Sequence, residues 1–405
     1  VYAGGVILLS ICAPFVLKSS IDKMTICLVV LFQGLAGVVN FYFVETQTII
    51  LTADGHGYVN NVVNVINQIV SYSAKIVMAL FGLNIIVLQF TYFIITVCKG
   101  VFYKKYFKDN YPWIDYDRAP SHAKLKDRNS YIVAELAWTL FSSTDMIVLS
   151  TFVSTQMSSV YSIYNMVFTS INLLLNAVYS SLIYILGKTY HEGLDKYVKV
   201  HDAFTSIFVG AITILMSVSY FLIIPFVKFY TAGVSDVEYV YPVLPIMFCL
   251  VQLISWSRYI TGNLTAIAGY AKQTGRISLV EAGINVVLSI ILVQRFGIVG
   301  VLFATVAALP IKVIYCTYLS DVKILKRSPM KTLRILIPNY LVFGACVVIN
   351  KMITININSI FAFITYGVLF TAVIASIGIL VNLLANREFI KIIKVFMRRK
   401  GDLKL

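Results

Sequence analysis

Between residues 60 and 75 the chain reads Asn60-Asn61-Val62-Val63-Asn64-Val65-Ile66-Asn67-Gln68-Ile69-Val70-Ser71-Tyr72-Ser73-Ala74-Lys75. On a helix at 100° per residue, six polar side chains of this segment fall within an arc of about 100°. They are Asn60, Asn64, Asn67, Gln68, Ser71 and Lys75. Apolar segments of membrane-spanning length flank this stretch, and a polar helix face cannot lie against lipid. We therefore expect this face to line protein or a water-filled cavity.

The composition is that of a polytopic membrane protein. Of the 405 residues, 59% are hydrophobic and 13% are charged, whereas a soluble domain has about 25% charged residues. Apolar runs of about 20 residues, long enough to cross a bilayer, recur along the chain. The six cysteines lie in apolar segments without CxxC spacing, which predicts neither a disulfide framework nor a metal site. The four histidines, among them His201, are expected to be solvated at cytoplasmic edges.

Hydropathy predicts twelve transmembrane helices. They are expected at residues 2–17, 25–51, 60–82, 84–103, 130–152, 160–186, 203–227, 240–268, 274–293, 298–318, 333–351 and 358–384. The chain opens at Val1 inside an apolar segment, and its first predicted helix is short. Because of this, we expect the start of the protein to be truncated.

An internal repeat relates the two halves of the chain. Pro14-Phe15-Val16 matches Pro225-Phe226-Val227, and Gly57-Tyr58 matches Gly269-Tyr270. A shift of about 214 positions carries the first polar stripe onto a second set that also shares one helical face. This set is Thr274, Ser278, Glu281, Asn285 and Ser289. The repeat predicts two missing helices, about 80 residues, before Val1 and a complete arrangement of six, six and two helices.

The predicted fold class is an all-α polytopic membrane protein with two pseudo-symmetric helical bundles and a C-terminal helix pair. Each bundle is a six-helix repeat, the first one truncated. The expected organisation is 1–103 for the remainder of the N-terminal lobe, 104–129 for a cytoplasmic linker, 130–318 for the C-terminal lobe, 319–332 for a cytoplasmic loop, 333–384 for the final helix pair and 385–405 for a basic cytoplasmic tail.

The distribution of Lys and Arg predicts the orientation. With the C-terminus in the cytoplasm, most basic residues outside the spans fall on the cytoplasmic side. The opposite side holds only Lys18, Lys23, Lys228, Arg295 and Lys351. This asymmetry accounts for the net charge of +15 without a nucleic-acid partner.

Ionisable side chains inside predicted spans are candidates for function, because inserting each costs about 2.5–3.5 kcal/mol. Glu45 and Arg258 occupy equivalent repeat positions with opposite charge, which predicts either a gate pair across a cavity or separate, nearer partners. Lys75 and Arg258 are the candidates for holding a phosphate, since an Arg guanidinium can donate two hydrogen bonds to one phosphate and a Lys ammonium supplies a positive charge. Asp145, Glu281 and Glu135 are candidates for binding a coupling H⁺ or Na⁺, with a structural role as the alternative.

Stripes that mix amides and aromatic rings predict a hydrophilic cavity suited to sugars. The alternative for any single Asn is an interhelical hydrogen bond. The residues expected to line the cavity are Glu45, Asn60, Asn64, Asn67, Gln68, Ser71, Asp145, Asn165, Asn172, Asn176, Ser278, Glu281 and Asn285. The sequence has no Gly-x-x-x-x-Gly-Lys and no Ser/His/Asp arrangement, so it predicts no catalytic residues and no metal site.

Several segments resemble a known family. They are Ala266-Ile267-Ala268-Gly269-Tyr270-Ala271-Lys272, the runs 281–293 and 296–305, Asp145-Met146-Ile147-Val148-Leu149-Ser150 and Val160-Tyr161-Ser162-Ile163-Tyr164-Asn165. They are similar to O-antigen and capsule repeat-unit flippases of the multidrug/oligosaccharidyl-lipid/polysaccharide exporter superfamily. The resemblance covers Phe41 to about Leu319 and implies two six-helix lobes around a central cavity. The chain departs from that pattern by lacking the first two helices.

The resemblance implies a transporter and not an enzyme. It would be a multi-pass protein of the bacterial inner membrane that moves a lipid-diphosphate-linked oligosaccharide between leaflets by alternating access. The implied partners are this lipid-linked oligosaccharide, membrane lipid, and polysaccharide polymerase and chain-length machinery. No cofactor is expected beyond a coupling H⁺ or Na⁺.

Other functions remain open from the sequence. The main alternative is a multidrug or other small-solute exporter of the same fold, whose cavity would be more apolar and would use acids. A membrane-embedded glycosyltransferase or polymerase would need ionisable residues on a sizeable outer loop, and no predicted outer loop exceeds about a dozen residues. A purely structural scaffold would not need repeated polar stripes.

Overall fold

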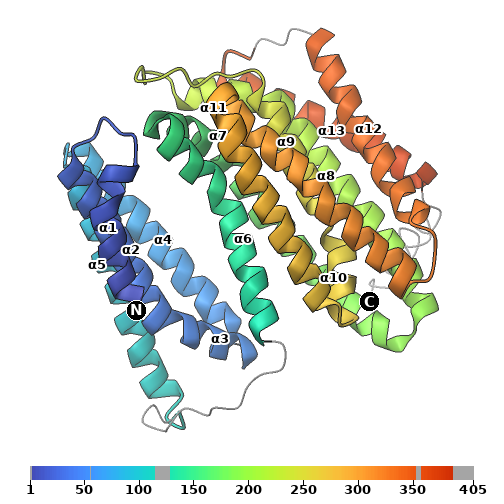
Figure 1. The fold of residues 1–405 in the computed structure, drawn as a ribbon, viewed down its shortest axis with the longest axis horizontal. Coiled ribbons are helices and arrows are strands. Elements are labelled where there is room, and N and C mark those ends of the chain that lie inside the picture. The colour runs from blue at the N-terminus through green and yellow to red at the C-terminus, as the bar shows by residue number, and fades with distance from the viewer. Residues whose placement is uncertain (1, 55, 115–127, 353–356, 386–405) are drawn as a thin grey trace, which may run out of the picture. The chain divides into compact units, whose positions relative to one another are not determined.

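The computed structural model describes an all-helical chain that divides into two compact units (Figure 1). It describes residues 2–54, 56–114, 128–352 and 357–385. Unit 1 is Val1–Ala123 and unit 2 is Lys124–Leu405. Residues 115–127 of the predicted linker and 386–405 of the predicted basic tail lie outside the described residues.

Unit 1 is built from five α-helices around a small aromatic core. The elements are α1 (Tyr2–Val16), α2 (Lys23–Asn40), the π-helical turn η1 (Phe41–Glu45), α3 (Thr46–Ala53), α4 (Gly57–Leu80) and α5 (Ile85–Asn110). Helix α2 packs against α1 and α5, and α4 packs against α5. Tyr103 and Phe107 are buried on α5, and this apolar face carries the helix past its predicted end at residue 103.

Hydrogen bonds join the turn between α3 and α4 to the end of α5. The Tyr111 hydroxyl donates to Asp54 Oδ2 at 2.9 Å, and His56 Nδ1 lies 2.9 Å from the same oxygen. The hydrogen bonds from Tyr111 and then His56 hold the pKa of Asp54 below its ordinary value. Desolvation, together with the Asp54 carboxylate, raises the pKa of Tyr111 to about 12. The ionised Asp54 carboxylate is therefore the form that stabilises this turn.

Unit 2 is built around the long helix α8. Its elements are α6 (Arg128–Val148), the π-helical turn η2 (Leu149–Val153), α7 (Thr155–Glu192), α8 (Leu194–Tyr230), α9 (Leu244–Ser257), α10 (Tyr259–Ile267), α11 (Ala271–Tyr318), the π-helical turn η3 (Leu319–Ile324), α12 (Met330–Met352) and α13 (Ile360–Ala385). Helix α8 contacts α7, α9, α12 and α13, and α11 contacts α6 and α9. The rings of Tyr164 and Phe168 both stack on Phe248 in the core.

A sharp reversal divides α11 into two halves that lie side by side. Gly297 adopts φ +53° and ψ −132°, a backbone conformation that residues with a Cβ rarely take. Three residues on, a Cβ at Gly300 would stand 2.4 Å from the Leu292 carbonyl oxygen. The break lies between the predicted helices 274–293 and 298–318. In unit 1 the repeat-equivalent glycine, Gly82, also has a positive φ, +67°, directly after α4.

The surface of the helices is apolar enough for a bilayer. Nine helical segments among the described residues are long and apolar enough to cross a membrane. Within Tyr58–Leu80, only 6% of the residues in the 18-residue apolar segment are buried. Large apolar side chains such as Leu80 (82% exposed) and Phe361 (81%) lie on the surface. Water would not tolerate so much contiguous apolar surface, whereas lipid requires it. The chain is an all-α polytopic membrane protein, as the sequence predicts.

An ionic cluster joins the segment after η3 to α8. The Arg327 guanidinium donates to both carboxylate oxygens of Asp202 at 2.7 Å and to Asp321 Oδ1 at 2.7 Å. His201, beside Asp202, is fully buried. The expectation that His201 is solvated is therefore wrong. The reason is that α8 begins at Leu194 and not at residue 203, so His201 lies on a packed helix face.

Candidate functional site

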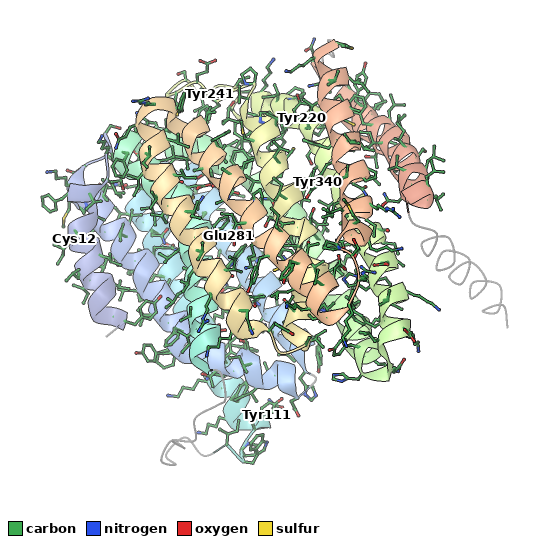
Figure 2. The ribbon with its side chains drawn as sticks, turned by 45° about the vertical axis from the view of Figure 1, so that its right-hand side comes forward. Cys12, Tyr111, Tyr220, Tyr241, Glu281 and Tyr340 are labelled. Carbon is green, nitrogen blue, oxygen red and sulfur yellow. The ribbon has the colours of Figure 1, made fainter. Side chains whose placement is uncertain are left out.

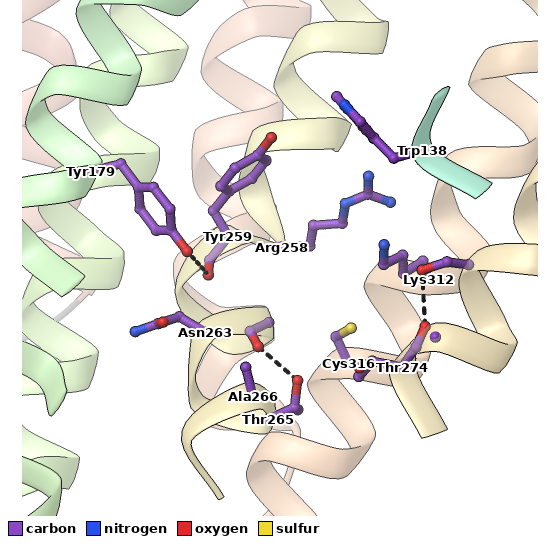
Figure 3. A pocket seen from close by; sticks show the side chains of 13 residues that line it. Trp138, Tyr179, Arg258, Tyr259, Asn263, Thr265, Ala266, Thr274, Lys312 and Cys316 are labelled. Carbon is purple, nitrogen blue, oxygen red and sulfur yellow. Dashed lines mark hydrogen bonds between the residues drawn. The ribbon is translucent and has the colours of Figure 1, made fainter. Parts of the chain in front are cut away.

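A polar cavity of unit 2 opens between α6, α7, α10 and the two halves of α11 (Figure 3). Its volume is about 330 Å³. The side chains that line it include Trp138, Tyr179, Arg258, Tyr259, Asn263, Thr274, Ser278, Lys312 and Cys316. Cationic, aromatic and small hydroxyl groups therefore converge on one space, which is the usual composition of a site for a polar ligand.

A break in the predicted helix 240–268 positions Arg258. The helix ends at Ser257 and restarts as α10 at Tyr259, with Arg258 between them at φ −88° and ψ −8°. The Arg258 carbonyl accepts from the Gly262 N–H at 2.7 Å and from the Thr261 hydroxyl at 3.0 Å. The interruption turns the guanidinium toward the cavity (Figure 3).

Two cations share one carboxylate beside the cavity. Arg258 Nη1 donates to Glu281 Oε1 at 2.5 Å, and Lys312 Nζ lies 4.0 Å from Glu281 Oε2. The side chains of Arg258 and Glu281 are 6% and 4% exposed, and that of Lys312 is 21% exposed. Glu281 is buried among the helices of unit 2 (Figure 2). The trio therefore carries one net positive charge in a weakly screened place, where an anion is favoured.

Aromatic rings form another wall of this cavity. Tyr259 stacks on Trp256 with centroids 4.1 Å apart, and Tyr179 meets Tyr259 edge to face at 5.0 Å. The Tyr179 hydroxyl donates to the Tyr259 carbonyl at 3.3 Å. Trp138 of α6 also borders the cavity. Fixed aromatic faces of this kind suit stacking of sugar rings beside a charged group.

A separate buried carboxylate lies where α6 meets α11. Asp145 accepts from the Thr305 hydroxyl at 3.0 Å and from the Tyr161 hydroxyl at 3.1 Å. Asn285 Nδ2 donates to Thr305 Oγ1 at 2.8 Å, while Asn285 Oδ1 and Ser289 Oγ are buried without a partner. Within the described ranges no cationic side chain lies within 4.0 Å of Asp145. These oxygens fit a small hard cation or a proton.

In unit 1 the first part of the predicted polar stripe faces α5. Asn60 Oδ1 accepts from Asn64 Nδ2 at 3.1 Å and from the Tyr103 hydroxyl at 2.8 Å. Asn64 Oδ1 accepts from Lys99 Nζ at 2.9 Å. Asn67 borders a groove between the two helices.

The remaining stripe residues of unit 1 are spread over different surroundings. Gln68 is exposed, and Ser71 is buried with a hydroxyl that finds no partner. The Lys75 ammonium lies over the Tyr92 ring, 4.6 Å from its centroid. Glu45 is exposed at the end of η1. Because Glu45 and Lys75 belong to unit 1 and Arg258 to unit 2, a gate pair or a shared phosphate site stays a prediction.

The predicted asparagines of α7 are spread along the helix. Asn172 Oδ1 accepts from Trp256 Nε1 at 2.7 Å, which is the interhelical alternative for that residue. Asn165 is half-buried and Asn176 is exposed. Ser278 borders the cavity, whereas Asn285 lies inside the unit at 0% exposure.

Sequence reasoning missed two members of these sites. Lys312 is not among the phosphate ligands predicted from the sequence, but it borders the cavity together with Arg258. Thr305 was not singled out, but it links Asp145 to Asn285. A search for other polar residues one or two turns along each half of α11 would have shown both residues, because they face the second stripe across the reversal at Gly297.

The fold has a solved counterpart. Over 92% of this chain and 80% of the other, the structure superposes on the inward closed conformation of the lipid II flippase MurJ, with a TM-score of 0.65 and 16% sequence identity. This similarity is one of fold. No family model matches the sequence, and no curated protein matches it either.

Proposed function

We propose that this protein moves a lipid-diphosphate-linked oligosaccharide across the bacterial inner membrane by alternating access. The observation that supports it most is the net-positive cavity of Arg258, Lys312 and Glu281, set among aromatic rings inside membrane-spanning helices. A positive charge at that depth is costly unless it serves an anionic ligand. The shared fold adds support, because the counterpart's name states that it flips lipid II.

In this proposal the two kinds of side chain divide the ligand between them. Arg258 and Lys312 hold the diphosphate, since guanidinium and ammonium groups are the usual phosphate ligands. Trp138 and Tyr259 stack on the adjoining sugar. Lys75 of unit 1, the other predicted phosphate ligand, meets the diphosphate at another stage of transport. Polysaccharide polymerase and chain-length machinery would act on the exported unit.

Asp145 is the proposed site of the coupling ion. An aspartate that is 5% exposed in a membrane span, with two hydroxyl donors and the Asn285 amide bonded to one of them, is suited to exchange H⁺ or Na⁺. We expect NaCl to raise the thermal unfolding temperature of the purified protein more than choline chloride does. Asp145→Asn should abolish that difference. If Na⁺ raises the unfolding temperature of the variant and of the parent protein equally, Na⁺ is not the ion bound at Asp145. H⁺ then remains as the proposed coupling ion, and a pH gradient imposed in the transport assay tests it.

A multidrug or small-solute exporter of the same fold is the alternative. Such a protein would attract lipophilic cations with an exposed acid. Here the acid beside the cavity, Glu281, is 4% exposed and already paired with Arg258, so the cavity repels cations. An efflux assay with a cationic dye separates the two, because only the exporter would lower dye accumulation.

The transport proposal is tested in proteoliposomes that contain a fluorescently labelled polyprenyl-diphosphate oligosaccharide. Dithionite quenching from outside measures how much label reaches the outer leaflet. Lys312→Ala and Arg258→Lys should each slow flipping about tenfold or more, because a charge-assisted hydrogen bond contributes about 1.5–3 kcal/mol. Lys188→Ala, an exposed lysine near the end of α7, is the matched control. Flipping at the parent rate in both cavity variants would refute the assignment.

A further inference from the structure

A groove in unit 1 resembles the cavity of unit 2 in its place within the repeat. It lies between α4 and α5, has a volume of about 280 Å³, and is lined by Asn67, Lys99 and mainly apolar side chains such as Val63, Ile66 and Phe102. Behind it, Lys99 donates to Asn64, which is hydrogen-bonded to Asn60.

The internal repeat relates the residues around Lys99 to residues that line the cavity of unit 2, although of the unit 1 set below only Lys99 itself borders the groove. Asn60, Asn64, Lys99 and Tyr103 of unit 1 correspond, at offsets of 213 or 214, to Thr274, Ser278, Lys312 and Cys316 of unit 2. All four unit 2 residues line the cavity described above. One difference matters for charge, because Asn67 stands where unit 2 has Glu281. Unit 1 thus keeps the lysine and replaces the neighbouring carboxylate with a neutral amide.

Lys99 is a cation without a close counter-ion. In the part of the chain that the structure describes, no carboxylate lies within 4.0 Å of its ammonium, and Glu45 attracts it only from farther away. The ammonium has three donors, and the neutral Asn64 takes one of them at 2.9 Å.

Lys99 is half-buried on α5 (Ile85–Asn110) and borders the groove. Its ammonium is bound by Asn64 of the neighbouring helix α4 at 2.9 Å, beside the groove. An anion at the groove would supply the missing charge.

We propose that this groove is a second binding site for the lipid-linked substrate, in which Lys99 holds a phosphate. The apolar walls from Val63, Ile66 and Phe102 take the first part of the attached hydrocarbon chain. A free phosphate would contact the ammonium alone, whereas a lipid phosphate would pair with the ammonium and place its hydrocarbon chain along the apolar walls. The identity of the lipid rests on the proposed function. The presence of an anionic lipid site in unit 1 does not.

The test is equilibrium binding of radiolabelled farnesyl diphosphate to the purified full-length chain. The parent protein should bind two molecules, one in each unit. Lys99→Gln keeps a donor for Asn64 but removes the charge, and it should weaken binding of one molecule about tenfold or more. Lys99→Arg keeps the charge and should bind both molecules of farnesyl diphosphate. Lys104→Ala, an exposed lysine on the same helix, is the matched control and should also bind both.

Two outcomes would overturn the inference. One is that Lys99→Gln, shown to be folded by its thermal unfolding, binds two molecules as tightly as Lys104→Ala. The other is that inorganic pyrophosphate competes at this site as strongly as unlabelled farnesyl diphosphate, which would mean that the apolar walls contribute nothing. Lys312→Ala reports separately on unit 2. If Lys312→Ala keeps both molecules while Lys99→Gln loses one, the proposed function fails at its cavity and the unit 1 site stands.

Discussion

Replacing Glu281 by Gln should destabilise the empty protein and strengthen its binding of anions at the same time. In the parent protein this carboxylate neutralises Arg258 at 2.5 Å and lies 4.0 Å from Lys312, with little solvent around any of the three. Removing one partner of a buried ion pair costs about 3–5 kcal/mol, because the remaining charge is left uncompensated. Here two cations would be left facing each other.

The gain in anion binding follows from the same geometry. A ligand phosphate that bridges Arg258 and Lys312 would lie roughly 6 Å from the Glu281 carboxylate, a repulsion of about 3 kcal/mol at an effective dielectric of about 20. Removing that repulsion corresponds to about a hundredfold tighter binding. At a ligand concentration of about 100 times the dissociation constant, binding returns about 2.7 kcal/mol of stability.

Thermal unfolding of the purified protein, followed by tryptophan fluorescence with and without inorganic pyrophosphate, measures both effects. Glu281→Gln should unfold at a lower temperature than the parent and gain more from pyrophosphate. Glu238→Gln, an exposed acid of the same unit, is the control and should match the parent in both respects. The reasoning is refuted if Glu281→Gln is as stable as the control, or if pyrophosphate stabilises it no more than the parent.

Three further predictions concern the scaffold. Arg327→Ala should lower the free energy of unfolding by about 3–5 kcal/mol, since it removes the guanidinium that pairs with the buried Asp321 and with Asp202, and chemical denaturation measures the loss. Asn339 and Asn382 exchange side-chain hydrogen bonds at 3.0 Å, so Asn382→Ala should cost about 1–3 kcal/mol, whereas replacing both by Leu should cost less. Asp54 has a lowered pKa, so its stabilising bond to Tyr111 is present above the unfolded pKa of about 3.9 and is lost as pH falls through the folded value. Tyr111→Phe should reduce this acid dependence of the unfolding temperature and leave the part that comes from His56.

Hydropathy was sufficient for the helices because the bilayer leaves the backbone few choices. The reversal at Gly297 was also predictable, since a glycine separates two apolar runs of spanning length. The break at Arg258 was not, because no Pro or Gly occupies it. Helix ends at the water boundary were set too short, as at α5 and α8, because polar residues there continue a buried face that only tertiary packing reveals.

The sequence was sufficient to predict that the site is polar, but not which of its side chains contact one another. The polar stripe correctly drew attention to Ser278, which borders the cavity. However, periodicity assigns a residue to a face without showing what packs on that face. Asn285 lies on the same stripe, but the second half of α11 covers it and Thr305 accepts its hydrogen bond. Lys312 joined the cavity only when the fold brought the two halves of α11 together.

The reversal of α11 has a consequence for how the protein is made. Arg258 and Glu281 are only 23 residues apart, and Lys312 follows on the second half of the same hairpin. Each charge therefore meets its partner soon after it leaves the ribosome, instead of waiting for a distant helix. Alone, each would be expensive to place in lipid, but a compact hairpin can enter the bilayer with its charges already neutralised in part. We therefore expect variants that break the trio of Arg258, Glu281 and Lys312 to accumulate less in the membrane than the parent protein does.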